Sequence, residues 1–380
     1  MSFSYLIYLY ILICVCLIAF EIGWLIYYGA RERLQRKRTA QYEEYLRQQC
    51  ETLASGGELP PLDNRQKLFF RNVFSNSHKI IAFACAFQNV SNEYPDEIRS
   101  AVGIVDEEAL YIMKHVQGHT KSASKVYSLK LYADMTAYTW RNRPGRIVEY
   151  QFAFLTDPSV YCRTYAMDVL YAVGTANDLH RAVMLLSNKN LFYHPKVLME
   201  GLMSFRGDHR VLSLLLIRDF DSLSEDYRIA VLEYCRHRAP LIGPFLVDFL
   251  TGEYSVDVKC TTLRYFRKYP IPEAKEIIVD FLENDSKYAW EISAVAAKAL
   301  SAYPEPDVKE LLKRKLSHPN WYVRRNSAES LVAIGLFVSE KAEIMNHSDR
   351  FAREILEYNL VVAEKSKMRV GADLPGGDVL

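Results

Sequence analysis

Two histidines four residues apart are the side chains best placed to do chemistry. His115 and His119 would share one face of a helix, where two imidazoles can hold a metal ion. Gly118 weakens such a helix, and no acidic third ligand follows at a recognised spacing. HExxH, GxSxG and Gly-rich phosphate loops do not occur. The sequence therefore predicts no metal site, no cofactor and no catalytic site.

The cysteines and paired acids lead to the same expectation. Seven cysteines are scattered without a CxxC pair, which is neither a disulfide framework nor a zinc pattern and is typical of a reducing compartment. The adjacent acids Asp106, Glu107 and Glu108 point in different directions on any regular element and indicate a solvated surface. The alternative function is a lyase or hydrolase on a helical scaffold, which would need converging polar residues.

Two basic clusters raise nucleic-acid binding as a second alternative. They lie at residues 141–146 and at Arg236, His237 and Arg238. The chain's net charge of +1 includes +4 from residues 31–38 and −1 from Glu21, so the rest carries −2. A nucleic-acid surface usually needs a strong basic excess. No nucleic-acid partner is therefore expected.

A repeated helical pattern must position whatever site exists. In residues 316–335, a polar turn precedes Val323 and Arg324, and small or apolar residues follow at helical offsets. Equivalent positions recur every 31–33 residues, at Glu291, Lys259, Arg228, Lys196 and Arg163, with weaker copies at Lys130 and Arg99. The residues three and seven after each anchor are predicted to lie in the core. Such a period indicates an all-α solenoid of helix pairs.

One unit combines a polar turn, valine, arginine, a small residue, leucine and glycine, at Asn320, Val323, Arg324, Ala328, Leu331 and Gly335. This pattern resembles the HEAT-repeat (armadillo-like) family over residues 155–336. The resemblance implies that Arg163, Arg228 and Arg324 are structural and form a ladder with turn aspartates. No His-Glu dipeptide occurs, which argues against the di-iron hydroxylases built on similar repeats. The resemblance also implies the membrane-anchored bacterial type of HEAT-repeat protein. For this type, a membrane glycosyltransferase of envelope polysaccharide synthesis is one implied partner.

Residues 3–28 predict a membrane anchor. The run is apolar apart from Glu21, carries aromatic residues at both ends and can cross a bilayer as a helix. Glu21 either approaches the interface or pairs with another membrane helix. No Lys or Arg precedes the run, whereas five bases follow at once: Arg31, Arg33, Arg36, Lys37 and Arg38. These bases predict a single pass through the inner (plasma) membrane with the N-terminus outside, and they could also hold anionic headgroups.

The predicted organisation has five parts. They are a transmembrane helix (3–28), a basic juxtamembrane helix and linker (31–63), degenerate N-terminal repeats or a cap (64–154), HEAT-like repeats with a C-terminal cap (155–364) and a disordered tail (365–380). The first helices of the later pairs are expected at Ala182–Leu186, Leu241–Leu250, Ala274–Leu282 and Val308–Leu316.

These inferences predict a membrane-anchored cytoplasmic scaffold or adaptor, not an enzyme, whose partner is a protein at or in the bilayer. In solenoids of this kind the second helix of each pair lines the inner curve. Four arginines lie on those helices away from the predicted core positions: Arg236, Arg238, Arg264 and Arg267. They predict a basic strip for an acidic protein segment. A solvated face with internal ion pairs is the alternative.

Overall fold

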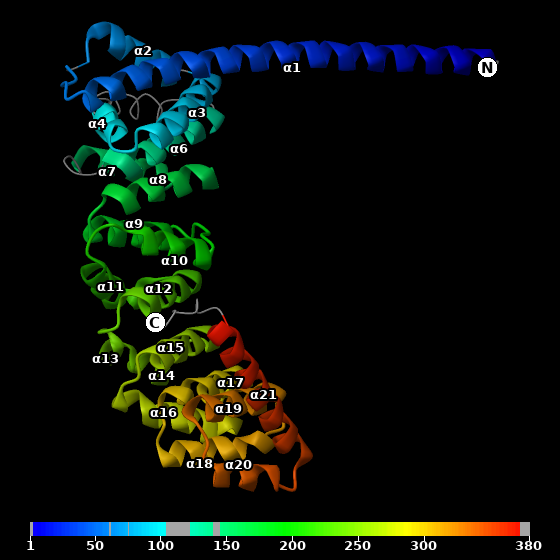
Figure 1. Ribbon diagram of the computed structural model, residues 1–380, viewed down its shortest axis with the longest axis vertical. Helices are drawn as coiled ribbons and strands as arrows, with labels where there is room; N and C mark the ends of the chain where they lie inside the picture. The colour runs from blue at the N-terminus through cyan, green and yellow to red at the C-terminus, as the bar shows by residue number, and fades with distance from the viewer. Residues whose placement is uncertain (1–2, 61, 75, 104–121, 140–144, 373–380) are drawn as a thin grey trace, which may run out of the picture. The chain divides into compact units, whose positions relative to one another are not determined.

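The computed structural model describes residues 3–60, 62–74, 76–103, 122–139 and 145–372 (Figure 1). The described residues are helical and contain no strand, as predicted. They form two compact units, residues 1–178 and 179–380. Each unit buries its own apolar core.

The first unit is built on one long helix, α1 (Phe3–Ala54). Its second half packs against α3 (Ser77–Glu93) and α4 (Glu97–Gly103). α2 (Asn64–Phe74) supplies Phe69 and Phe70, which contact Tyr42 of α1 and Phe83 of α3 in an aromatic cluster. α6 (Ser122–Thr139), α7 (Gly145–Phe154) and α8 (Val160–Val173) complete the unit. Figure 1 shows that the first half of α1 projects beyond these helices. The expected transmembrane and juxtamembrane segments are therefore one continuous helix.

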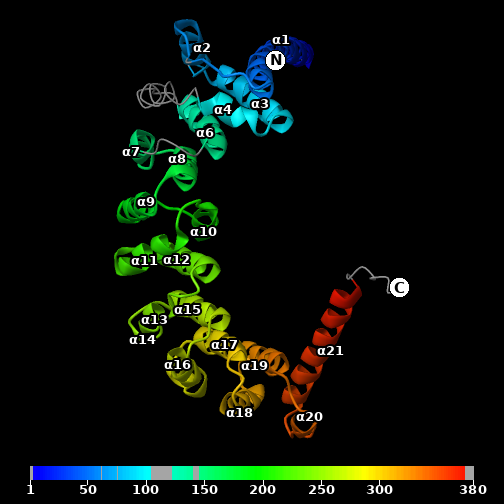
Figure 2. The same cartoon turned by 60° about the vertical axis from the view of Figure 1, so that its left-hand side comes forward.

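The second unit consists of helix pairs in two rows (Figure 2). The first helices are α9 (Ala176–Asn188), α11 (His209–Arg218), the short α13 (Gly243–Leu246) and α14 (Asp248–Thr251), α16 (Pro272–Glu283) and α18 (Pro306–Arg314). The second helices are α10 (Pro195–Ser204), α12 (Glu225–Arg238), α15 (Val256–Lys268), α17 (Trp290–Ala299) and α19 (Trp321–Ile334). Each second helix packs on the next, and α20 (Val338–Met345) and α21 (Arg350–Ala372) follow α19.

Turn chemistry sets where these helices begin and end. Asn320 Oδ1 accepts from the Tyr322 amide at 2.8 Å and so caps the start of α19, and proline opens α16 and α18. Gly335 ends α19 with a φ of +93°, a conformation that side chains other than glycine rarely adopt.

The arginines of the repeat are structural, although their partners differ from the expected aspartate ladder. Arg163 and Arg324 each donate from Nη1 to carbonyls five and six residues earlier, over 2.7–3.2 Å. Arg353 makes the same pair of bonds, and Arg228 reaches the carbonyls of Phe220 and Asp221. Each guanidinium thus ties its helix to the turn before it, because turn carbonyls lack helical partners.

The predicted core register is correct in most repeats. The positions three and seven after the anchors are buried at Ala166, Leu170, Val231, Cys235, Thr262, Phe266, Ser327 and Leu331. In α10 the register is shifted by one residue, since Leu198 and Leu202 are buried while Met199 and Met203 are half-buried. Lys298 occupies a predicted core position of α17 but is only partly buried.

Three predicted helix boundaries differ from the structure. The helix expected at Ala182–Leu186 is part of α9, which begins six residues earlier, at Ala176. Leu241–Leu250 was expected to be one helix, yet it is divided into α13 and α14, with Leu241 exposed. Proline in the first turn of α13 favours a helix start there, after the exposed Leu241. The last helix was expected to end at Glu364 but continues to Ala372, so part of the expected disordered tail is helical.

Candidate functional site

A pocket of about 560 Å³ lies between the second helices of the second unit. Its volume falls in the range of ordinary ligand sites. α15 and α17 supply most of its wall, and α12 and α19 contribute one residue each. The lining residues are Arg236, Leu263, Arg264, Arg267, Lys268, Val295, Lys298, Ala299 and Asn326.

Three cations on α15 form the middle of the pocket. Arg264, Arg267 and Lys268 share one helix face because they are three and four residues apart. Arg267 is exposed and has no hydrogen bond or ion pair within the described part of the chain. Arg264 reaches Glu233 only at 4.0 Å, and Lys268 Nζ donates to the Arg236 carbonyl at 3.0 Å. The charges on α15 are therefore largely uncompensated.

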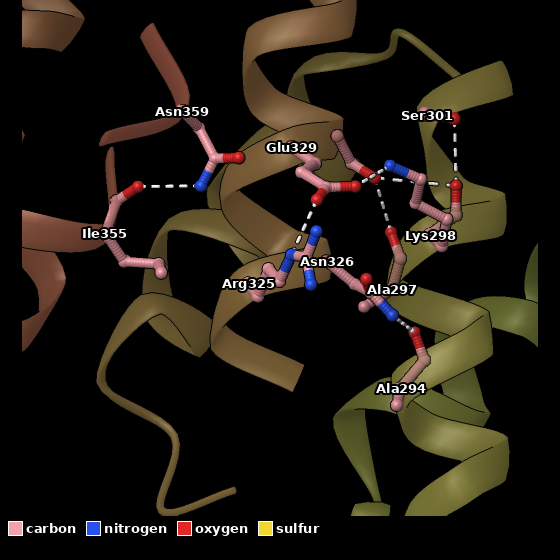
Figure 3. Close-up of polar contacts among 10 residues, drawn as sticks. Ala294, Ala297, Lys298, Ser301, Arg325, Asn326, Glu329, Ile355 and Asn359 are labelled. Carbon is pink, nitrogen blue, oxygen red and sulfur yellow. Dashed lines mark hydrogen bonds and ion pairs between the residues drawn. The ribbon is translucent and has the colours of Figure 1, made fainter. Parts of the chain in front are cut away.

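Carboxylates neutralise the cations at both ends of the pocket. At one end, Arg236 binds Glu233 at 2.5 Å. At the other end, Lys298 and Arg325 approach Glu329 from two directions (Figure 3), and the Arg325 Nε to Glu329 Oε1 distance is 2.9 Å. An incoming anion is therefore favoured at α15, between two paired ends.

The remaining lining offers apolar surface and one amide. Leu263 and Ala299 are buried and Val295 is half-buried. Asn326 donates from Nδ2 to the Ala294 carbonyl at 2.7 Å (Figure 3), which orients its side chain and leaves Oδ1 as an acceptor. The pocket thus combines positive charge, apolar area and one hydrogen-bond acceptor.

The charges of the pocket also alter nearby pKa values. Burial lowers the pKa of His237, and the positive charges of Arg236 and Lys268 lower it further. Burial alone would raise the pKa of Glu329, but hydrogen bonds and charges from Lys298 and Arg325 lower it from its ordinary value of 4.5. A neutral imidazole and an ionised carboxylate are both expected in a positive field.

The comparison with known families agrees with this geometry. Residues 243–332 match a family model described as HEAT repeats. These residues are therefore similar to HEAT repeats. The match includes α15, α17 and α19, so all of the pocket except Arg236 lies in this segment.

Other comparisons add no functional information. No curated protein matches the chain. Among solved structures, the crystal structure of an engineered protein from the Northeast Structural Genomics Consortium matches at 14% identity and a TM-score of 0.34. The matched region covers 86% of this chain and 96% of the engineered protein.

The stacked second helices bring three of the four predicted binding residues together. Arg236, Arg264 and Arg267 line the pocket, whereas Arg238 donates to the Met203 carbonyl at 3.2 Å and does not line it. Sequence reasoning missed Lys268, Lys298 and Asn326. A signal existed for Lys298, because a lysine at a core position of a HEAT repeat needs a partner or solvent.

The membrane-facing candidates lie on α1. By length and composition, α1 can cross a membrane, with a mean hydropathy of 2.5 over its most apolar stretch. Its apolar side chains from Tyr8 to Tyr28 are exposed in the structure. The basic block follows without a helix break: Arg36 pairs with Glu32 at 2.5 Å, and Arg31 lies 2.9 Å from the His78 ring.

Several sequence candidates lie outside the described residues, including His115, His119 and Arg141 to Pro144. Among the described residues, no group of three or more histidine, cysteine or acidic side chains could hold a metal ion. Burial raises the pKa of the thiol of Cys260, which lies on α15, to about 11. That thiol is therefore protonated and unreactive at neutral pH.

Proposed function

We propose that this protein is a membrane-anchored scaffold that captures an acidic segment of a protein partner in the α15 pocket. The observation that carries the proposal is the row of Arg264, Arg267 and Lys268, whose charges no carboxylate closely compensates. Uncompensated cations at the centre of an open pocket attract carboxylates and speed association. HEAT arrays generally present such extended surfaces to proteins.

The distribution of charge favours a protein segment over a nucleic acid. The cationic row occupies little more than one helical turn, and Glu233 and Glu329 stand at its two ends. A phosphate backbone carries charge at every nucleotide and would meet these carboxylates as it left the pocket. A short acidic segment places its charge only where the pocket is positive.

The anchor directs the scaffold to partners at the bilayer. With α1 in the membrane, Arg31, Arg33, Arg36, Lys37 and Arg38 would lie at the inner surface, where anionic headgroups attract them. The pocket would then face the cytoplasm. A membrane glycosyltransferase, the partner implied by the family resemblance, would meet this requirement if it carried an acidic cytoplasmic segment. The proposal assigns no catalytic step to the scaffold itself.

Charge reversal tests the pocket in the full-length protein. We expect Arg264→Glu combined with Arg267→Glu to preserve helical content and the melting temperature, because exposed charges contribute about 0–1 kcal/mol each to stability. Capture of the partner by crosslinking in membranes should fall at least about tenfold. Mass spectrometry of the crosslinked product identifies the partner and shows whether it is a glycosyltransferase.

A matched control isolates the pocket from general charge effects. Arg210 is exposed on α11, a first helix outside the pocket, so Arg210→Glu should capture the partner as the parent protein does. A folded double variant with undiminished capture would show that the pocket is not the binding site. Equal losses in the double variant and in Arg210→Glu would also contradict the proposal.

A further inference from the structure

Three exposed aromatic rings form a shelf beside the pocket, at the starts of α17 and α19. Trp290, Trp321 and Tyr322 are 46%, 46% and 52% exposed. Trp290 stacks on Tyr322 with ring centroids 5.2 Å apart, and Trp321 meets Tyr322 edge-on at 5.1 Å. Large aromatic side chains left in solvent as one cluster are unusual on a monomer and are enriched where proteins bind proteins.

The shelf is continuous with the basic pocket. Tyr322 lies one helical turn before Asn326, a lining residue, so both side chains are on one face of α19. Arg325 connects the two parts, because its guanidinium stacks over Trp321 at 5.2 Å and also binds Glu329, the partner of Lys298. The Trp321 ring and the pocket's Lys298 are thus held by the same ion-pair network.

We propose that the shelf is the second half of the partner site. The partner segment would place its carboxylates on Arg264 and Arg267 and, farther along, an apolar side chain on Trp290 and Tyr322. The inference rests on the proposed function. It adds the order in which the acidic and apolar residues follow one another in the partner segment. The positive charge of the pocket speeds the encounter with the partner segment and orients it. The aromatic rings, desolvated on binding, supply the anchoring contact, as aromatic residues do in protein interfaces.

The helix spacing fixes the separation between the two contacts. Neighbouring helix axes lie about 8–10 Å apart, so α15 and α19 are about 20 Å apart across α17. An extended peptide advances about 3.3–3.6 Å per residue. The acidic pair and the apolar residue should therefore be separated by about four to six positions.

Two synthetic peptides test this order. Both carry fluorescein and the acidic pair Glu-Glu followed by Gly-Ser-Gly-Ser, and they end in either Phe-Gly or Asn-Gly. Fluorescence anisotropy measures their binding to the full-length protein in lipid nanodiscs. Burying a phenyl ring favours the first peptide, so we expect it to bind at least about tenfold more tightly.

Variants assign that preference to the shelf. Trp290→Ala and Tyr322→Ala should each weaken the Phe peptide towards the affinity of the Asn peptide and leave the Asn peptide unchanged. Phe245, an equally exposed aromatic residue on α13, provides the control, and Phe245→Ala should keep the full preference. Circular dichroism checks that each variant is folded, and two independent variants guard against local unfolding in one.

The outcomes separate this inference from the proposed function. Suppose that both peptides bind equally and that Arg264→Glu combined with Arg267→Glu abolishes the binding of both. The pocket is then supported as a binding site, and the shelf is excluded. If the Phe preference survives in folded Trp290→Ala and Tyr322→Ala, the shelf is likewise excluded. If neither peptide binds better than a neutral peptide of the same length, both proposals fail.

Discussion

Glu329 is the residue on which two basic side chains of the site converge. Lys298 and Arg325 lower its pKa below 4.5 against the effect of burial. A carboxylate with a lowered folded-state pKa stabilises the protein above its unfolded-state pKa, and the contribution is lost as pH falls through the folded-state value. We expect Glu329→Gln to be about 1 kcal/mol less stable than the parent at pH 7, and the difference to shrink below pH 4.5.

Urea unfolding followed by circular dichroism at pH 7 and in steps below pH 4.5 measures this difference. Glu354 supplies the comparison, because its ion pair with Arg350 is mostly exposed. Glu354→Gln should change stability by less than about 0.5 kcal/mol at either pH. A Glu329→Gln protein as stable as its parent at pH 7 would show that the network does not stabilise the fold.

At the scale of the element, α19 joins the array to the site. Leu331 is fully buried in this helix, while Asn326 and Tyr322 on the same helix face the pocket and the shelf. Leu331→Asp places an unpaired charge in the core, which costs several kcal/mol and is comparable with the net stability of a domain. We expect this variant to lose its cooperative thermal transition by circular dichroism.

The matched substitution on the same helix is Ala333→Asp, at an exposed position two residues later. It should melt within a few degrees of the parent, since surface substitutions usually change stability by about 0.5 kcal/mol or less. A Leu331→Asp protein that melts at the parental temperature would contradict the assignment of Leu331 to the shared core of the repeats.

For the whole molecule, the distribution of basic residues around the apolar run sets the expected topology. Five bases follow the run and none precedes it, so the N-terminus should lie outside and the HEAT repeats in the cytoplasm. Alkaline phosphatase fused after the last residue should be inactive, because it needs an oxidising exported compartment. Green fluorescent protein fused there should fluoresce.

The same two reporters fused after residue 63 test topology without the repeats. Both fusion positions should give the same result, since one spanning helix places everything after it on one side. Strong phosphatase activity at either position would show that the topology is the reverse of the predicted one and that the pocket lies on the opposite side of the membrane.

The sequence by itself determined the features that depend on local periodicity. Helix pairs from α8 to α19, the buried positions after Arg228 and Arg324, and the apolar half of α1 follow from spacing and side-chain type. It misplaced features that depend on a single turn, such as the break between α13 and α14 and the shifted register of α10. A small change in turn length rotates the whole helix that follows. The constant spacing of three and seven residues after each anchor then no longer marks the buried positions.

Only the tertiary structure decided what the site contains. Arg236, Arg264 and Lys298 are about one repeat apart in the sequence, and their common pocket exists because successive second helices stack side by side. Stacking also paired Lys298 with Glu329 on the next helix and laid Trp290 on Tyr322. The physical reason is that charge compensation and ring contact act over a few ångströms between neighbouring units, whereas periodicity describes each unit alone.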